Sequence, residues 1–292
     1  MLNPEIKRVK LSVIIATHAR DASLTKLLES LEAQLNPDRE ILIADNGTQA
    51  PSPVPSDVPI LAHIHDPRPG KCRAQNAAMA RSSGEIKIFL DDDLTVAADY
   101  LDRVEEFFAT HPEFAAMKGR IIAAEDPIAK AGAMWPYLDL PISDHGSAVI
   151  EVRGVLGANM AFRSSALAQV GGFDERLGPG ACGHEEETEM SARLRRHGYR
   201  IGYCPGALVY HEVDPARADR ERYIRIARER GRCRMLHEEH GIVEVASKCA
   251  IGAVRLAIAK AVGANIERNA REERRYAVAR GMLDGFRRRS TD

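Results

Sequence analysis

The N-terminal part of the chain alternates short apolar runs with an amphipathic stretch. Residues 11–16, 40–45 and 86–90 are rich in Ile, Leu and Val, and most of these apolar side chains follow one another directly. This pattern is typical of strands that are buried on both faces of a parallel sheet. Between the first two runs, leucines recur at helical spacing and predict an amphipathic helix over residues 23–35. A strand, a helix and a second strand in this order predict a βαβ unit, and hence an α/β fold.

The same reading predicts further elements along the chain. A proline-rich surface loop is expected over residues 50–59, and a long connection with little periodicity over residues 125–148. Residues 154–180 are expected to form a strand, a short helix and a glycine-rich loop, and two short strands should flank Pro205. The remaining elements are expected to be helices at 72–81 and 98–110, a strand at 114–124, and a helix that begins near Glu185.

Three consecutive carboxylates, Asp91, Asp92 and Asp93, follow the apolar run at residues 86–90. Like charges at the end of a strand repel one another and raise one another's pKa unless a cation lies among them. Oxygen ligands suit Mg²⁺ or Mn²⁺, so the three aspartates are a candidate metal site. A solvated acidic turn that caps the next helix explains an isolated Asp-Asp-Asp sequence equally well.

Two further polar residues, Thr17 and Asp45, follow the first two predicted strands. Open α/β sheets bind ligands outside the carboxyl ends of their strands, so these residues and the three aspartates are expected at one ligand site. A dinucleotide site would need the sequence GxGxxG directly after the first strand. The chain reads ATHARD there, without glycine, which argues against a dehydrogenase of this type.

Lys71 and Arg73 lie at the start of the helix that is predicted over residues 72–81. Cations at a helix N-terminus oppose the helix dipole. Because helix N-termini bind phosphates readily, the two cations hint at an anionic ligand. A solvated basic turn explains either residue equally well.

Acidic residues mark the helix that is expected to begin near Glu185. Glu185, Glu186 and Glu187 would lie in its first turn, where the dipole favours carboxylates whatever their role. His211 ends the last predicted strand, and a lone histidine in such a place is more often a satisfied polar residue than a ligand. The spacing alone leaves both a structural and a catalytic role open for these residues.

The composition, with 28% charged and 45% hydrophobic residues among 292, is ordinary for a globular protein. The formal net charge of −1 is unevenly spread, because residues 213–292 carry 19 Lys and Arg against 12 Asp and Glu. This asymmetry predicts an acidic body over residues 1–212 and a basic helical extension over residues 213–292.

The five cysteines are scattered and contain no CxxC pair, so neither a disulfide framework nor a zinc site is expected. The charged start of the chain does not read as a signal peptide, and no uninterrupted apolar run of about 18 residues is present. These features predict a reduced, cytoplasmic protein.

The extension contains two different predicted helices. Residues 214–239 are rich in arginine, and residues 243–263 are apolar but interrupted by Lys248, Arg255 and Lys260. The second stretch is expected to form an amphipathic helix that either lies on the inner, anionic face of a membrane or docks against the acidic body. No aromatic residues are interleaved with the arginines as stacking platforms, so nucleic acid is not an expected partner.

Taken together and in order, the motifs resemble a family 2 glycosyltransferase with the GT-A fold, over roughly residues 11–211. The resemblance implies a Rossmann-like mixed sheet flanked by helices, with a catalytic domain over residues 1–212. It also implies a nucleotide-sugar donor (a UDP-, dTDP- or GDP-sugar), Mn²⁺ or Mg²⁺ at an Asp-x-Asp signature, and inversion at the anomeric centre. A glycan or lipid-linked acceptor is expected mainly from the basic extension. The motifs that carry it are VIIATHAR, EILIADNGT, GKCRAQN, FLDDD, GANMAFR, GGFDERLG, HEEETEM and PGALVYH.

The same resemblance implies a role for particular positions. Glu187 falls on the position of the catalytic base, and because the family commonly has Asp there, Glu186 is a competing candidate. The implied metal ligands are Asp91, Asp93 and His211. The implied nucleotide-sugar-binding residues are Thr17, Asp45, Arg73, Asp91 and Asp92.

Elementary chemistry agrees with these roles. A bound cation stabilises the charge that develops on a diphosphate leaving group, and a carboxylate can take the proton of an acceptor hydroxyl as it attacks. A sugar-nucleotide pyrophosphorylase would need a glycine-rich basic loop after the first strand, which the sequence THARD is not. An inactive nucleotide-sugar-binding sensor or scaffold is the remaining alternative, and the intact acidic clusters and His211 argue against it.

Overall fold

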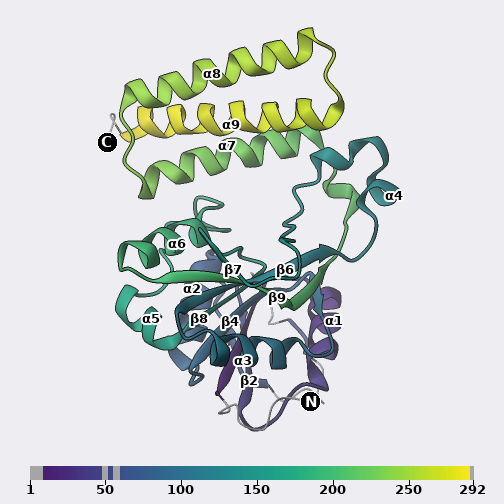
Figure 1. The fold of residues 1–292 in the computed structure, drawn as a ribbon, viewed down its shortest axis with the longest axis vertical. Helices are drawn as coiled ribbons and strands as arrows, with labels where there is room; N and C mark the ends of the chain where they lie inside the picture. Colours follow the sequence, from purple (N-terminus) through teal and green to yellow (C-terminus); the bar gives the residue numbers. More distant parts are fainter. Residues whose placement is uncertain (1–8, 48–51, 55–59, 290–292) are drawn as a thin grey trace. The chain divides into compact units, whose positions relative to one another are not determined.

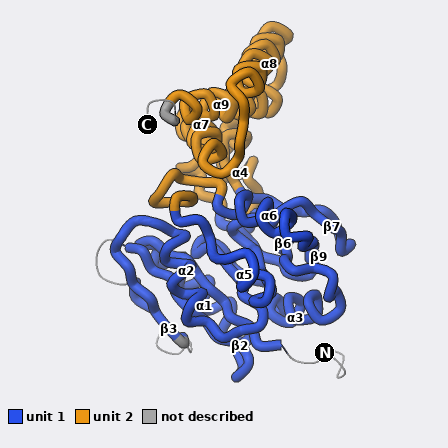
Figure 2. The backbone as a smooth tube through the Cα atoms, turned by 90° about the vertical axis from the view of Figure 1, so that its left-hand side faces the viewer, with its two compact units in different colours: residues 1–124, 141–175, 186–212 blue, residues 125–140, 176–185, 213–292 orange. Residues whose placement is uncertain are grey.

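The computed structural model describes residues 9–47, 52–54 and 60–289, so most of the proline-rich segment 50–59 lies outside the described residues. The chain divides into two compact units (Figure 2). The two units are not consecutive segments, because two stretches from the middle of the chain belong with its C-terminal part. Unit 1 comprises Met1–Ala124, Pro141–Glu175 and Glu186–Glu212, and unit 2 comprises Glu125–Leu140, Arg176–Glu185 and Val213–Asp292.

The described residues of unit 1 form a mixed sheet, which confirms what the resemblance implies, and this sheet has nine strands (Figure 1). Its strands are β1 (Leu11–Thr17), β2 (Arg39–Asp45), β3 (Ile60–His65), β4 (Ile86–Asp91), β5 (Leu94–Val96), β6 (Phe114–Ala123), β7 (Ile150–Val152), β8 (Asn159–Arg163) and β9 (Arg200–His211). The order is β3-β2-β1-β4-β8-β6-β9-β5, and β7 pairs with β9. The first four of these strands are parallel, whereas β8 runs antiparallel to both of its neighbours.

Helices cover both faces of this sheet. They are α1 (Asp21–Glu32), α2 (Lys71–Arg81), α3 (Tyr100–Thr110), α5 (Ser164–Val170) and α6 (Glu186–Arg196). Along β1, Val13 and Ile15 lie in the core that α1 and α3 share, and Ile14 lies in the core that contains residues of α2, α5 and α6. Successive side chains of a strand point to opposite faces, so a strand covered on both faces has to be apolar throughout.

The parallel pairing brings three predicted site positions to one edge of the sheet. Thr17 at the end of β1 is the register partner of Asp45 at the end of β2. On the other side of β1, Ala16 is the partner of Asp91 at the end of β4. The polar residues that follow the buried runs are therefore neighbours in space although they are far apart in sequence.

Two expectations about local structure are wrong. The residues around Pro205 form the single strand β9, whose register with β6 shifts between Gly119 and Arg120. This irregularity accommodates a proline that cannot donate to the ladder. The expected loop at 125–148 contains α4 (Pro127–Ala131) and a 3₁₀-helix, η1 (Gly132–Tyr137), which are too short to show a helical period.

Unit 2 contains three long helices, α7 (Arg220–His237), α8 (Ile242–Ala261) and α9 (Ile266–Arg289), and a 3₁₀-helix, η2 (Pro215–Arg217). Helices α7 and α9 lie side by side (Figure 1) and approach closely at glycines. A Cβ atom on Gly231 would lie 2.0 Å from the carbonyl oxygen of Val278, and one on Gly281 would lie 1.9 Å from that of Arg228. In the described part of the chain, no helix has both the length and the apolar character to cross a membrane.

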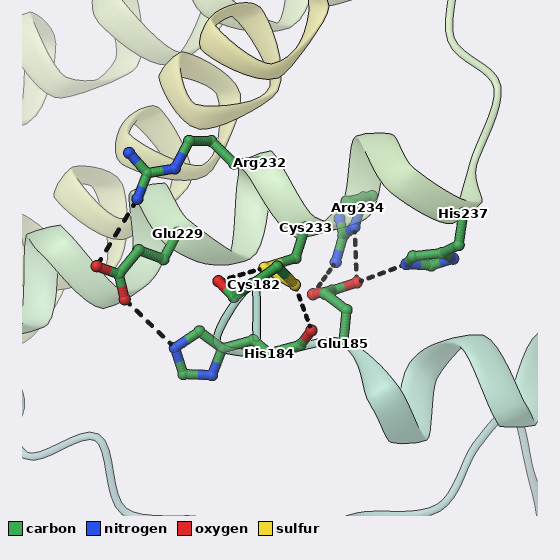
Figure 3. The surroundings of a disulfide bond; sticks show 8 residues. All are labelled: Cys182, His184, Glu185, Glu229, Arg232, Cys233, Arg234 and His237. Atoms are coloured by element: carbon green, nitrogen blue, oxygen red, sulfur yellow. Dashed lines mark hydrogen bonds and ion pairs between the residues drawn. A yellow bond between two sulfur atoms is a disulfide. The ribbon is translucent and has the colours of Figure 1, made fainter. Parts of the chain in front are cut away.

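A disulfide joins Cys182 to Cys233 of α7, with 5.6 Å between their Cα atoms (Figure 3). The expectation that the cysteines remain unpaired is therefore wrong for these two. The partners are 51 residues apart, and only the folded chain brings them together. The cysteine pattern consequently gives no support to the predicted reduced environment.

Candidate functional site

The buried carboxylates at the end of β4 are held by a cation from the loop after β1. Asp92 and Asp93 are 3% and 6% exposed. One guanidinium nitrogen of Arg20 donates to Asp92 at 3.0 Å and to Asp93 at 2.8 Å, and the hydroxyl of Thr17 donates to Asp92 at 2.8 Å. The sequence predicts a cation among these aspartates but does not identify Arg20, which it leaves in an unassigned polar loop.

Burial dominates the electrostatics of Asp92. It raises the pKa of the carboxyl group, and the opposing influence of Arg20 and of the Thr17 hydrogen bond does not cancel it. The neighbouring carboxylates Asp93 and Asp91 raise the pKa further. The strand end therefore concentrates more negative charge than Arg20 neutralises, which favours a further cation.

His211, at the end of β9, lies beside Asp93. Its Nε2 atom is 3.2 Å from Oδ1 of Asp93, and its Nδ1 atom is 2.9 Å from the carbonyl oxygen of Glu212. Burial lowers the pKa of His211, but the hydrogen bond and charge of Asp93 outweigh it and the pKa is raised. A carbonyl at Nδ1 fixes the ring with Nε2 towards the carboxylate, which is the arrangement common to metal-binding histidines.

The described residues contain no group of three or more His, Cys, Asp or Glu side chains arranged to hold a metal ion. Asp93 and His211 nevertheless supply an oxygen and a nitrogen donor at one point. Mg²⁺ and Mn²⁺ commonly use few protein ligands and complete their shells with water and substrate phosphates. These two residues fit such a cation.

Asp91 is held by Lys71, the first residue of α2. The Nζ atom of Lys71 is 2.5 Å from Oδ1 of Asp91 and 3.9 Å from Oε1 of Glu186. Burial lowers the pKa of Lys71, but the charges of Asp91 and Glu186 outweigh it and the pKa is raised, so the side chain stays a cation. Lys71 thus bridges the end of β4 and the first turn of α6. The sequence pointed to Lys71 as a possible contact for an anionic ligand but did not predict this bridge.

The three consecutive glutamates have different surroundings. Glu185 belongs to unit 2, where its carboxylate lies 3.1 Å from Arg234 and 3.5 Å from His237 of α7 (Figure 3). Burial raises the pKa of Glu185, but the nearby His237 ring and the hydrogen bonds from Arg234 outweigh it and the pKa is lowered. Glu186 and Glu187 begin α6 in unit 1. Only these two glutamates lie on the helix that faces Lys71.

Helix α6 is anchored beside Glu187. The hydroxyl of Ser191 donates to the carbonyl oxygen of Glu187 at 2.6 Å and accepts the backbone N–H of Val155 at 3.1 Å. Glu187 also contributes to the raised pKa of Lys71, which places its charge near that cation. The side chain of Glu187 is therefore carried by a fixed helical turn next to the strand-end carboxylates.

Asp45 and Arg73 lie in less direct contact with this cluster. The carboxylate of Asp45 is fully buried and accepts the N–H groups of Gly47 at 2.8 Å and Ser52 at 2.7 Å, with Nε2 of His63 at 3.0 Å. Asp45 thus organises the chain that follows β2. Arg73 makes a partly exposed ion pair with Glu175 at 3.2 Å.

Comparison with known proteins gives a consistent result. The model of the family described as glycosyl transferase family 2 matches residues 12–171. The pre-mycofactocin glycosyltransferase of Mycobacterium tuberculosis is 30% identical over 215 residues, which are 69% of this chain and 42% of that relative. The glucosyl-dolichyl phosphate glucuronosyltransferase of Haloferax volcanii is 23% identical over 220 residues, or 70% of each protein. This chain therefore spans less than half of the first relative.

Solved glycosyltransferases share the fold. The mannosyltransferase PcManGT from Pyrobaculum calidifontis, solved with GDP-Man and Mn²⁺, superposes with a TM-score of 0.63 at 16% identity and covers 96% of this chain and 88% of its own. GalNAc-T7, solved with UDP, GalNAc and Mn²⁺, superposes with a TM-score of 0.53 at 14% identity, over 75% of this chain and 48% of its own. The mixed sheet with its flanking helices is thus the GT-A fold.

Proposed function

The chain belongs to glycosyl transferase family 2, and from this membership we propose that unit 1 transfers a sugar from a nucleotide-sugar donor to a hydroxyl group of a glycan or lipid-linked acceptor, with inversion at the anomeric centre. The observation that carries the proposal is the bridge from Asp91 through Lys71 to Glu186. It holds an acidic strand end, suited to a cation and a diphosphate, next to the helical turn that carries a candidate base. Direct displacement needs these two functions side by side.

The donor occupies the edge where the parallel strands end. Thr17, Asp45, Arg73, Asp91 and Asp92 are the proposed contacts for its nucleotide and sugar, because open α/β sheets bind ligands outside the carboxyl ends of their strands. Asp45 acts there through the backbone of Gly47 and Ser52, which its carboxylate positions. UDP-, dTDP- and GDP-sugars are the donors to test.

Asp93 and His211 would hold a divalent cation, Mn²⁺ or Mg²⁺, and Asp91 is the third proposed ligand. The cation would supply positive charge against the diphosphate as it leaves. The presence of Mn²⁺ in two solved structures with this fold supports this choice. Arg20 holds Asp92 and Asp93 in place for that role, and Lys71 holds Asp91.

Glu187 is the proposed general base. As the acceptor oxygen attacks the anomeric carbon, its proton passes to the carboxylate of Glu187, and the bond between that carbon and the diphosphate oxygen breaks with its electron pair on the diphosphate. Attack opposite to the leaving group inverts the centre. Glu186 is 5% exposed and lies beside Lys71, whereas Glu187 is only half-buried.

The acceptor class is inferred from the basic extension and from one relative. The relative from Haloferax volcanii is named for a dolichyl phosphate substrate, which supports lipid-linked acceptors. Within the predicted catalytic domain, residues 1–212, we assign catalysis to the part that forms unit 1, and we assign a separate, non-catalytic role to the helical extension 213–292. The alternatives of a pyrophosphorylase and of an inactive sensor have no observation in their favour.

The proposal is tested by combining donor binding with turnover. We expect one class of nucleotide sugar to raise the melting temperature in the presence of Mn²⁺, because a ligand at 100 times its Kd adds about 2.7 kcal/mol to the stability. With that donor and a panel of glycan and lipid-linked acceptors, release of the nucleoside diphosphate should depend on the acceptor. If the donor binds but none of the acceptors promotes release of the nucleoside diphosphate, the inactive sensor would be favoured.

Asp93→Asn tests the cation without changing the size of the side chain, and Asp144→Asn, at an exposed ion pair with Arg120, is the matched control. We expect Asp93→Asn to lose the part of the thermal shift that requires Mn²⁺ and to lose transfer, whereas the control keeps both. Full turnover in the presence of EDTA would contradict the metal assignment and leave the transfer reaction standing.

A further inference from the structure

Helix α8 has one face buried within unit 2 and one face exposed. Val245, Gly252 and Ala259 recur every seven residues and are buried. Val245 lies in a core with Met282 of α9, and a Cβ atom on Gly252 would lie 3.2 Å from Cα of Tyr276. Figure 1 shows α8 running alongside α9. Its inner face therefore has a partner within the unit.

The outer face of α8 is aliphatic along its whole length. Five large side chains on this face are between 50% and 76% exposed: Val243, Ile251, Val254, Ile258 and the capping residue Val262. At about 100° per residue they fall within roughly 100° of the helix circumference. The exposed alanines Ala246, Ala250, Ala257 and Ala261 widen the stripe on one side. Large aliphatic side chains in one continuous stripe mark an interaction surface.

Basic side chains border this stripe. Lys248 and Arg255 lie along one edge and Lys260 along the other, and their side chains are 43%, 54% and 58% exposed. Each also lies beside a carboxylate of the same unit: Glu244 at 2.7 Å from Lys248, Glu272 at 3.4 Å from Arg255 and Glu273 at 4.0 Å from Lys260. The helix has a single acidic residue, Glu244. Long basic side chains can lay their methylene groups on an apolar layer while their charged ends reach towards anions. The border therefore fits a ligand that is apolar within and negatively charged at its surface.

The charge of the extension distinguishes between the candidate occupants. Residues 213–292 carry 19 Lys and Arg against 12 Asp and Glu, so two copies of the extension would bring together two segments of like net charge. An anionic bilayer has the opposite charge, and it accepts an aliphatic stripe without requiring a complementary shape. Since α9 covers the inner face, α8 can offer a bilayer only its outer face, lying parallel to the surface.

We propose that the outer face of α8 binds the surface of an anionic phospholipid bilayer. The valines and isoleucines of the stripe enter the boundary between headgroups and acyl chains, and Lys248, Arg255 and Lys260 contact the lipid phosphates. This surface is independent of the donor site, so its failure would leave the proposed sugar transfer untouched. A lipid-linked acceptor would be presented at the same bilayer.

The test is flotation of the full-length protein with vesicles of phosphatidylcholine alone or of phosphatidylcholine mixed with phosphatidylglycerol. We expect binding to the anionic vesicles only, and weaker binding as salt is added. Ile251→Asn with Ile258→Asn should reduce the binding constant by at least about tenfold, since two aliphatic groups no longer leave water. Ile128→Asn is the control, because Ile128 is 57% exposed in α4 of the same unit.

The charge is tested by Lys248→Gln with Arg255→Gln, which should weaken binding by about 25-fold, or about 1 kcal/mol for each cation. Arg81→Gln with Arg153→Gln removes the same charge from exposed positions of unit 1 and should have little effect. Val254→Trp keeps the stripe apolar, and its emission should move to shorter wavelength on anionic vesicles. Equal binding to both kinds of vesicle, unchanged binding by the Ile251/Ile258 variant, or dimerisation through the stripe would each overturn the proposal.

Discussion

The acidic strand end of unit 1 is unusual for its buried charges, whereas helix α8 of unit 2 is unusual for its exposed aliphatic side chains. Asp92, Asp93 and His211 are no more than 6% exposed, whereas Val243 and Val254 of α8 are more than half exposed. Globular proteins usually expose charged side chains and bury large aliphatic ones. Burying a charge and exposing an apolar group both cost free energy, so each departure needs a compensating interaction.

The two units differ in where that compensation comes from. In unit 1 much of it is internal, because Arg20 and Lys71 are bound to the carboxylates that would otherwise be costly. Along the outer face of α8, neighbouring cations supply only a border, and the aliphatic groups themselves stay in water. Unit 1 thus has a prepared polar site, and α8 has a surface that becomes favourable only on contact with something apolar.

The largest expected effect comes from removing the candidate base of the polar site in unit 1. Glu187→Gln keeps the size of the side chain but removes the proton acceptor, so kcat should fall by roughly 10²- to 10⁴-fold while donor binding is retained. Steady-state kinetics and donor titration measure the two quantities separately. Glu186→Gln is the neighbouring control, and a greater loss there would move the base to Glu186. If neither substitution matters, a glutamate base at the start of α6 is wrong.

A buried cation of unit 1 should contribute more to the free energy of unfolding than a partly exposed one. Lys71→Met leaves Asp91 and Glu186 without their shared cation and should lower the free energy of unfolding by about 3 to 5 kcal/mol. Arg73→Met, two residues along the same helix, breaks a partly exposed ion pair with Glu175 and should cost at most about 1 kcal/mol. Urea unfolding measures the free energy for both variants. Equal losses of stability would contradict the proposed bridge from Asp91 through Lys71 to Glu186.

The strands and the acidic cluster of unit 1 could be predicted because their signals are local. A run such as residues 11–16 is apolar at every position, which only a strand covered on both faces requires. The strand-end aspartates stand directly after such a run, whereas Glu187 was assigned as the candidate base only through the family resemblance. Arg20, in contrast, reaches Asp92 across 72 residues of sequence, and no local pattern specifies that contact.

Unit 2 was less predictable for the same reason. The helices of the extension could be inferred from periodicity, but the segment 176–185 joins them only through long-range contacts, among them the disulfide between Cys182 and Cys233. Glu185 looks like its two neighbours in the sequence and differs from them only because Arg234 and His237 come to lie beside it. In unit 1, too, the three-residue strands β5 and β7 are too short to show any alternation.

The disulfide provides a way to weaken unit 2 alone. The single tryptophan, Trp135, lies in η1 of unit 2, so its fluorescence reports unfolding of this unit. Cys182→Ser with Cys233→Ser opens a link between residues 51 apart and should lower the free energy of unfolding by about 2 to 4 kcal/mol. Cys249→Ser, at a free cysteine of the same unit, should change it little. An equal effect of both variants would show that the link contributes no stability.

The smallest expected effect is a pH dependence in unit 2, and it comes from His184. Burial, followed by the charge of Arg230, lowers the pKa of His184 to about 4, although Asp139 and Glu185 act in the opposite direction. The remaining charged groups near the ring are Arg222 and Glu229, the latter 3.9 Å away (Figure 3). The folded unit therefore holds a neutral imidazole that an unfolded chain protonates more readily.

A lowered histidine pKa gives stability that is present above the unfolded value and is lost as the pH falls towards the folded value. With an unfolded pKa near 6.5, unit 2 should lose about 1 to 2 kcal/mol between about pH 7 and pH 5. Glu185, whose pKa is lowered, stays ionised over this interval in both states and adds its own loss only at lower pH. The Trp135 transition of His184→Gln should be less sensitive to pH than that of the wild type. Equal pH dependence would mean that His184 titrates as freely in the folded unit as in the unfolded chain, and that its surroundings do not exclude charge.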